Sequence, residues 1–140
     1  MAPRSEEQFD KIRQNRKQHI MDIAMELFAV DSYHAVSISK IANTAKISKG
    51  LLYNYFESKE HLLKVILEKG LVEVYKDFDA NHDGVLSKEE FRKFIRQNFE
   101  TVKKNKGFWK LYYTLSMQTD VQQILQQISH TRIESYPPLL

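Results

Sequence analysis

Oxygen-bearing side chains recur at short intervals between residues 79 and 90, in the run Asp-Ala-Asn-His-Asp-Gly-Val-Leu-Ser-Lys-Glu-Glu. Hard cations such as Ca²⁺ are held by carboxylate, amide and backbone carbonyl oxygens, and a loop that wraps around one needs a glycine at its sharpest turn. Gly84 stands at that turn, between the third and fourth ligand positions. The spacing predicts a Ca²⁺ site whose ligands are Asp79, Asn81, Asp83, the carbonyl of Val85, Ser87 acting through a water, and Glu90.

Helical patterns flank this run on both sides. Leu67, Leu71, Val74 and Phe78 precede it, and Phe91, Phe94, Ile95 and Phe99 follow it, at the spacing of one apolar helix face. The segment 67–99 therefore resembles an EF-hand. A metal-free alternative stays open, in which Ser87 caps the next helix and Glu90 completes a capping box. EF-hands usually work in pairs, and a single loop implies weak affinity for Ca²⁺.

A second group of residues could bind an anionic polymer. Between residues 37 and 56 the chain carries Lys40, Lys46 and Lys49 and no acidic residue, which is the charge bias that a phosphate-facing surface needs. Tyr53 and Tyr55 follow, and phenol groups donate well to phosphate oxygens. Two short predicted helices separated by about four residues suit a helix-turn-helix. The alternative is a small helical bundle with solvated lysines.

The stretch Ser37-Ile-Ser-Lys-Ile-Ala-Asn-Thr-Ala-Lys-Ile-Ser-Lys-Gly-Leu-Leu-Tyr-Asn-Tyr-Phe-Glu-Ser-Lys-Glu-His-Leu-Leu63 resembles the DNA-binding head of the TetR-type repressor family. The most specific part is residues 48–59, and the resemblance extends over about residues 16–75. It implies a three-helix head followed by a long connecting helix. One departure from the family pattern is Lys46, where members usually have glycine; a left-handed backbone there would cost about 1 kcal/mol.

The resemblance also implies which residues meet DNA. Ser37 would cap the second helix and approach a phosphate, Ser39 would face the base edges, and Tyr53, Tyr55 and Lys59 would hold the backbone. The expected DNA-binding set is Ser37, Ser39, Ser48, Lys49, Gly50, Leu51, Tyr53, Tyr55 and Lys59. For Lys59 there is an additional physical reason, because a lysine at the N-terminus of a helix makes a favourable phosphate site.

These residues must be positioned by an all-α fold, because strand-like alternation is absent and proline occurs only at positions 3, 137 and 138. Ser37, Ser48 and Ser58 each suit a helix N-cap. The helices are expected at about 9–29, 38–44, 49–56, 59–78, 88–104, 108–118 and 121–134. Residues 8–58 are expected to form the helix-turn-helix domain and residues 59–140 a connecting helix with a short helical regulatory region. Gly70 lies in the middle of the connecting helix, where it would permit a bend.

Composition excludes several classes of protein. The chain of 140 residues has no cysteine, which excludes disulfides and thiolate metal sites, and its net charge of +3 favours an anionic partner only weakly. No apolar run approaches the roughly 18 residues of a membrane span, and a cytoplasmic location is expected. No arrangement of nucleophile and base, and no phosphate-cradling glycine loop, is present, so catalysis is not expected.

The predicted function is a sequence-specific transcriptional regulator, in the form of a repressor, that binds a double-stranded DNA operator as a homodimer. A small-molecule effector and Ca²⁺ are its expected ligands. The resemblance implies further helices that would build an effector cavity and a dimer bundle, and the three helices expected after the acidic loop are too few for both. A truncated C-terminal region or a different mode of dimerisation is therefore expected. The alternative function is a Ca²⁺-binding interaction module with no role on DNA.

Overall fold

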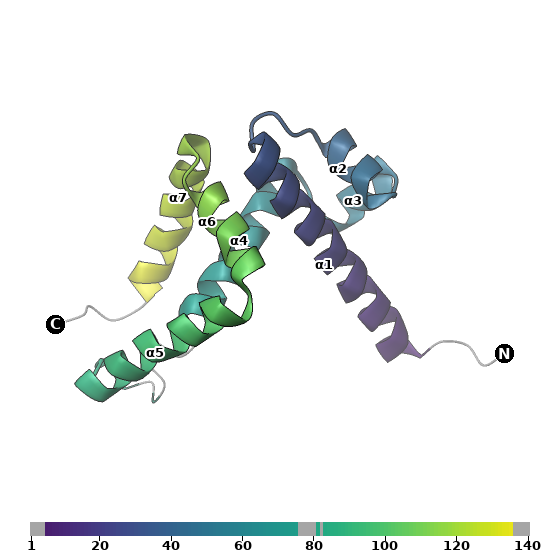
Figure 1. Cartoon of the computed structure of the whole chain (residues 1–140). Helices are drawn as coiled ribbons and strands as arrows, with labels where there is room; N and C mark the ends of the chain where they lie inside the picture. Colours follow the sequence, from purple (N-terminus) through teal and green to yellow (C-terminus); the bar gives the residue numbers. More distant parts are fainter. Residues whose placement is uncertain (1–4, 76–80, 82, 136–140) are drawn as a thin grey trace. The chain divides into compact units, whose positions relative to one another are not determined.

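The computed structural model describes residues 5–75, 81 and 83–135, with the side chains described as far as residue 130. These residues form seven helices and no strand (Figure 1), so the predicted all-α fold is confirmed. The helices are α1 (Glu6–Asp31), α2 (Ile38–Ala45), α3 (Lys49–Tyr55), α4 (Lys59–Tyr75), α5 (Lys88–Lys104), α6 (Lys106–Ser116) and α7 (Thr119–Ser135). They divide into two compact units, one ending at Leu63 and the other beginning at Lys64.

Serine side chains set the starts of the helices in the first unit. Ser37 Oγ accepts a hydrogen bond from Lys40 N at 3.1 Å, Ser48 Oγ from Leu51 N at 3.0 Å, and Ser58 Oγ from His61 N at 3.0 Å. Each bond satisfies one of the backbone N–H groups that a helix leaves unpaired in its first turn. The three N-caps predicted from the sequence are therefore confirmed. Ser5 caps α1 in the same way, in a capping box with Gln8.

The core of the first unit lies where α1 meets α2 and α3. Helices α2 and α3 are too short to be stable alone, and burial of their apolar sides holds them in place. Ile38 and Ile47 are half-buried. The buried side chains of this unit are Ile20, Met21, Ala24, Met25, Phe28, Ala29, Tyr33, Val36, Ile41, Ala42, Ala45, Leu52, Phe56, Leu62 and Leu63.

The second unit has a smaller core, formed by Ile66, Leu67, Leu115, Val121 and Ile128. Beside it lies a group of half-buried aromatic rings on α6. Trp109 meets Phe108 and Tyr112 edge-on, and Phe108 stacks on Tyr112, with ring centroids 5.0–6.0 Å apart. The rings therefore pack mainly against each other, as expected of core or interface aromatics.

Helix α5 differs from its sequence-based expectation. It begins at Lys88 and ends at Lys104, as predicted, but none of its residues is buried. The flanking apolar positions were expected to pack as an EF-hand exit helix. Instead Phe91, Ile95 and Phe99 are 50%, 40% and 65% exposed, and Phe94 stacks on Tyr75 of α4 with centroids 6.1 Å apart. Helical periodicity identifies an apolar face, and it does not say what covers that face.

Candidate nucleic-acid interface

A tight left-handed turn joins α2 to α3. Lys46 has φ 59° and ψ 41°, and its backbone N–H bonds Ala42 O and Asn43 O. Ile47 N then bonds Ala42 O at 3.0 Å, which closes the end of α2. This pattern is a helix C-cap of the kind that glycine usually provides. The turn geometry expected of a helix-turn-helix is therefore present, with lysine in the strained position.

Helix α3 has one buried side and one exposed side. Leu52 is fully buried and Phe56 is 1% exposed, so this side of the helix lies in the core of the unit. Tyr53, on the other side, is 48% exposed. Ser48, Lys49 and Gly50 are exposed as well, while Leu51 and Tyr55 are half-buried. This face offers a hydroxyl, an ammonium and a phenol next to a residue without a side chain, and these groups can bond phosphates and base edges.

The absence of a side chain at Gly50 leaves the N-terminal part of α3 open. A β-carbon built there would meet only Ser48 Oγ, at 3.9 Å. Nothing inside the protein therefore requires glycine at this position, and its backbone is helical rather than left-handed. The open space at Gly50 would permit close approach of an outside partner.

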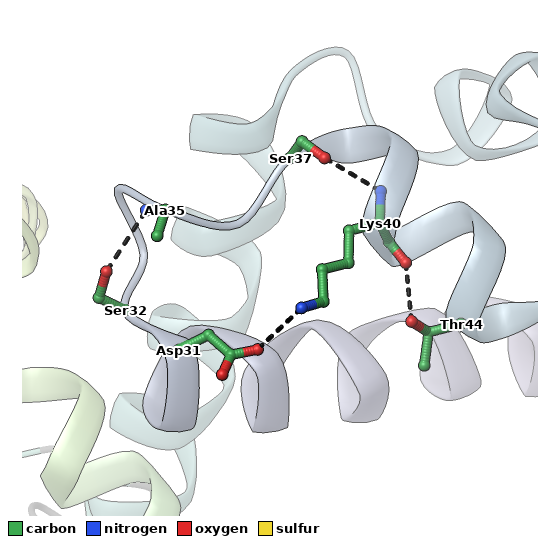
Figure 2. Close-up of polar contacts among 6 residues, drawn as sticks. All are labelled: Asp31, Ser32, Ala35, Ser37, Lys40 and Thr44. Carbon is green, nitrogen blue, oxygen red and sulfur yellow. Dashed lines mark hydrogen bonds and ion pairs between the residues drawn. The ribbon is translucent and has the colours of Figure 1, made fainter.

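The start of α2 carries two more serines of the expected DNA-binding set. Ser37 is exposed and Ser39 is half-buried. The hydroxyl oxygen of Ser37 accepts the capping bond from Lys40 N (Figure 2), which leaves its O–H group able to donate to a phosphate. Lys40 forms an exposed ion pair. Its Nζ lies 3.2 Å from Asp31 Oδ2 at the end of α1 (Figure 2). All three lysines that gave this stretch its positive bias are exposed, and Asp31 offsets part of the charge of Lys40.

Lys59 does not point outward as a phosphate ligand would. Its Nζ donates to the carbonyl oxygens of Tyr33 at 2.9 Å and Val36 at 3.1 Å, with His34 O at 3.5 Å. The same ammonium lies 4.4 Å from the centroid of the Tyr33 ring. An ammonium has three donors, and here all three are directed at the loop between α1 and α2. The sequence placed Lys59 at the start of α4 correctly, but this contact was not foreseen.

Two cations of α1 reach the end of α3, and sequence reasoning missed both. The Arg13 guanidinium lies 5.4 Å from the Tyr55 ring centroid, and Lys17 Nζ lies 5.8 Å from that of Phe56. Arg13 is exposed, so its N–H groups face solvent beside a tyrosine expected to contact DNA. The contacting residues are about forty positions apart, and no local pattern in the sequence signals such a pairing.

The acidic loop of the second unit holds part of the predicted metal site. Gly84 has φ 77°, the left-handed conformation expected at the turn. Asn81 Oδ1 accepts from Asp83 N at 3.2 Å, and Asp83 Oδ1 accepts from Val85 N at 2.8 Å. Asp79 lies outside the described residues. Among the side chains that the structure describes, no three of His, Cys, Asp and Glu gather closely enough to hold a metal.

Ser87 and Glu90 form the capping box that was the metal-free alternative. Glu90 N donates to Ser87 Oγ at 3.1 Å, and Ser87 N donates to Glu90 Oε2 at 2.9 Å. Only one carboxylate oxygen of Glu90 is used in this arrangement. The remaining donor set is made of oxygens, which suits Ca²⁺ chemically, and the described ligands fit such an ion in part.

Comparison with known proteins identifies the first unit. Residues 20–66 match the family model described as bacterial regulatory proteins, tetR family. The N-terminal domain is a TetR-type helix-turn-helix domain. Residues 76–95 give a weak match to the model described as EF hand.

The TetR-type domain has relatives among transcriptional regulators. The uncharacterized regulator YerO of Bacillus subtilis is 30% identical over 123 residues, which are 86% of this chain and 43% of YerO. The repressor AcnR of Corynebacterium diphtheriae is 29% identical over 96 residues, or 58% of this chain and 50% of AcnR. The chain thus spans about half the length, or less, of these relatives. Because they are regulators and not enzymes, they agree with the expectation that this chain is no enzyme.

The fold agrees with solved structures of the same class. A TetR-like transcriptional regulator from Rhodococcus sp. RHA1 superposes with a TM-score of 0.61 at 28% identity, over 85% of this chain and 64% of that one. None of the helices in the described part of the chain is long and apolar enough to cross a membrane.

Proposed function

We propose that this chain is a DNA-binding transcriptional regulator, in the form of a repressor, whose α3 enters the major groove of an operator. The observation that carries the proposal is the two-sided α3: Leu52 and Phe56 are buried, while Ser48, Lys49, Gly50 and Tyr53 remain exposed. A helix held so firmly on one side presents the other side at a fixed position, as base readout requires. The family match of residues 20–66 supports the same role. We propose that the protein acts in the cytoplasm.

Each exposed group has a proposed task. Lys49 and Leu51 would face base edges, where an ammonium bonds guanine acceptors and an apolar side chain packs on a thymine methyl group. Gly50 would let the backbone of α3 come close to the groove. Ser37, Ser39 and Ser48 would contact the DNA at the two helix starts, and Tyr53 and Tyr55 would bond backbone phosphates.

Repression by occlusion of a promoter supposes tight binding, and one helix-turn-helix reads only a few base pairs. We infer that the chain acts as a homodimer on two half-sites one helical turn apart. A small-molecule effector would bind outside the TetR-type domain and alter the spacing of the two heads. AcnR, a relative of this domain, is named a repressor, which supports the proposal of repression.

Ca²⁺ is proposed as a second regulator. Asn81, Asp83, the carbonyl of Val85, Ser87 and Glu90, together with Asp79, would hold the ion. When bound, it supplies charge neutralisation of these carboxylates and a fixed connection between the helices that flank the loop. The left-handed Gly84 and the oxygen-only donor set support this assignment. If Ca²⁺ changes the affinity for DNA, DNA must change the affinity for Ca²⁺ by the same factor.

The test is fluorescence anisotropy with a duplex enriched by the wild-type chain from a randomised library, in Ca²⁺ and then in chelator. Lys49→Ala should weaken binding to the enriched duplex and relax its base preference. Glu90→Gln should abolish any effect of Ca²⁺, while Glu89→Gln, at the neighbouring exposed position, should not. If the wild-type chain enriches no duplex yet binds Ca²⁺, the alternative function, a Ca²⁺-binding interaction module, is favoured.

A further inference from the structure

We propose that Lys59 is a positioning residue of the DNA-binding head, which ties the first turn of α4 to the loop that begins α2. This inference rests on the proposed function, because it concerns how the head is held for binding. It replaces the expected phosphate contact of Lys59 with an internal one. The contacts that carry it all lie within the first unit.

The ammonium of Lys59 is fully engaged by backbone carbonyls. Its three donors face Tyr33 O, Val36 O and His34 O, at 2.9, 3.1 and 3.5 Å. The Tyr33 ring adds a cation–π contact at 4.4 Å. Contacting a DNA phosphate would require Lys59 to give up at least one of these bonds.

The loop that Lys59 contacts lies between α1 and α2. It follows Ser32, a non-glycine residue with φ 77°, where the backbone is strained. Within the loop, Ser32 Oγ accepts from Ala35 N at 3.3 Å (Figure 2). Its carbonyls lie outside any helix, so they need donors from elsewhere. Lys59 supplies donors to three of them.

The ends of the loop are attached to the core and to α2. Tyr33 packs edge-on against Phe28, with centroids 5.1 Å apart, and Val36 is 1% exposed. The next residue, Ser37, is the N-cap of α2 (Figure 2). A shift of the loop therefore displaces the start of α2, and α3 follows because the Lys46 turn joins it directly to α2. Lys59 thereby acts on the reading face without touching DNA.

Substitution of a positioning residue and substitution of a phosphate ligand have different effects on how DNA affinity depends on salt concentration. Affinity falls as salt concentration rises, so the slope of log affinity against log salt concentration is negative. Removing one phosphate contact makes this slope less steep by about 0.9. Removing a positioning residue weakens binding but leaves the number of phosphate contacts unchanged. For Lys59→Met we expect affinity for the enriched duplex to fall about tenfold, the equivalent of one well-placed base contact, with the slope unaltered.

Lys59→Arg separates the two roles a second time. It keeps the charge, so a phosphate ligand would retain both affinity and slope. The planar guanidinium cannot place one donor on each of three carbonyls, so a positioning residue would lose affinity in this variant as well. Lys103→Met, the same change on an exposed residue of α5 in the other unit, should leave affinity and slope unaltered. If Lys59→Met does not fold, Lys59→Arg carries the test.

Two results would overturn the proposal. One is a change in the salt slope in Lys59→Met, and the other is an affinity for the enriched duplex that is unchanged in both Lys59→Met and Lys59→Arg. Failure of the proposed function is a different result, in which the wild-type chain enriches no duplex. In that case amide exchange without DNA still tests the contact. Ala35 N–H and Lys40 N–H should exchange faster in Lys59→Met, and Glu90 N–H at the start of α5 should not. Equal exchange at Ala35 and Lys40 in the wild type and the variant would remove the positioning role.

Discussion

The ring of Tyr112 on α6 occupies the place that a side chain of Gly70 on α4 would need. A β-carbon built on Gly70 would lie 2.2 Å from Tyr112 Cε2 and 2.6 Å from Cζ. The hydroxyl of the same tyrosine donates to Leu67 O at 2.8 Å. Glycine thus lets an aromatic ring lie directly on the backbone of α4. Gly70 lies inside α4, which is one helix from Lys59 to Tyr75, and close packing is a reason for the glycine that the sequence did not show.

Gly70→Ala should lower the free energy of unfolding by about 1–3 kcal/mol, because the added methyl group forces the Tyr112 ring to move. This loss exceeds the gain of up to about 1 kcal/mol in helix propensity. Urea denaturation measures the change. Gly107→Ala is the matched control, since a β-carbon at Gly107 on α6 meets nothing within 4 Å. Equal effects of the two substitutions would contradict the packing role of Gly70.

The hydroxyl of Tyr112 should contribute separately from its ring. Tyr112→Phe keeps the ring on Gly70 and removes only the bond to Leu67 O, so the free energy of unfolding should fall by about 1 kcal/mol. Thermal and urea denaturation would detect it. Tyr113→Phe, at the neighbouring position that is 68% exposed, should change the stability little. A loss as large in the Tyr113 variant would mean that the hydroxyl bond is not the cause.

For the left-handed turn between α2 and α3 we predict a substitution that increases stability. Lys46 has φ 59°, and a residue with a β-carbon pays about 1 kcal/mol in this conformation. Lys46→Gly should therefore raise the free energy of unfolding, by up to about 1 kcal/mol after the entropy of glycine in the unfolded chain is counted. Lys46→Ala keeps the strain and should give no such gain. If the alanine variant were stabilised equally, strain at this position would not be the reason.

Local chemistry explains why so much of this fold follows from the sequence. Helix α5 was predicted at its observed bounds, because Ser87 and Glu90 form a capping box and basic residues close the last turn. The same logic located α2 and α3, through Ser37 and Ser48. These signals involve residues within four positions of each other, and they need no knowledge of the tertiary structure.

Residues whose partners lie far along the chain were harder to interpret. The acceptors of Lys59 are 23 to 26 residues away, and at the start of a helix its charge alone suggested a phosphate. The ion pair of Lys40 with Asp31, nine residues away, was likewise not signalled by the sequence. The exposed face of α5 shows the converse, since its apolar spacing predicted burial that the described structure does not provide. In each case the type of residue was informative and its partner was not encoded locally.

Arg13 provides the last prediction, because it is a cation that the sequence did not connect with the DNA-binding face. Its guanidinium lies 5.4 Å from the ring centroid of Tyr55, and stacking of this kind leaves the N–H edge free to bond a phosphate. Arg13→Ala should make the slope of log affinity against log salt concentration less steep by about 0.9, and it should weaken binding to all duplexes alike. Arg16→Ala, an exposed arginine on the same helix, should leave the slope unaltered. A slope that is the same in the wild type and the Arg13 variant would exclude the contact, and equal losses in both variants would indicate a general effect of charge on α1.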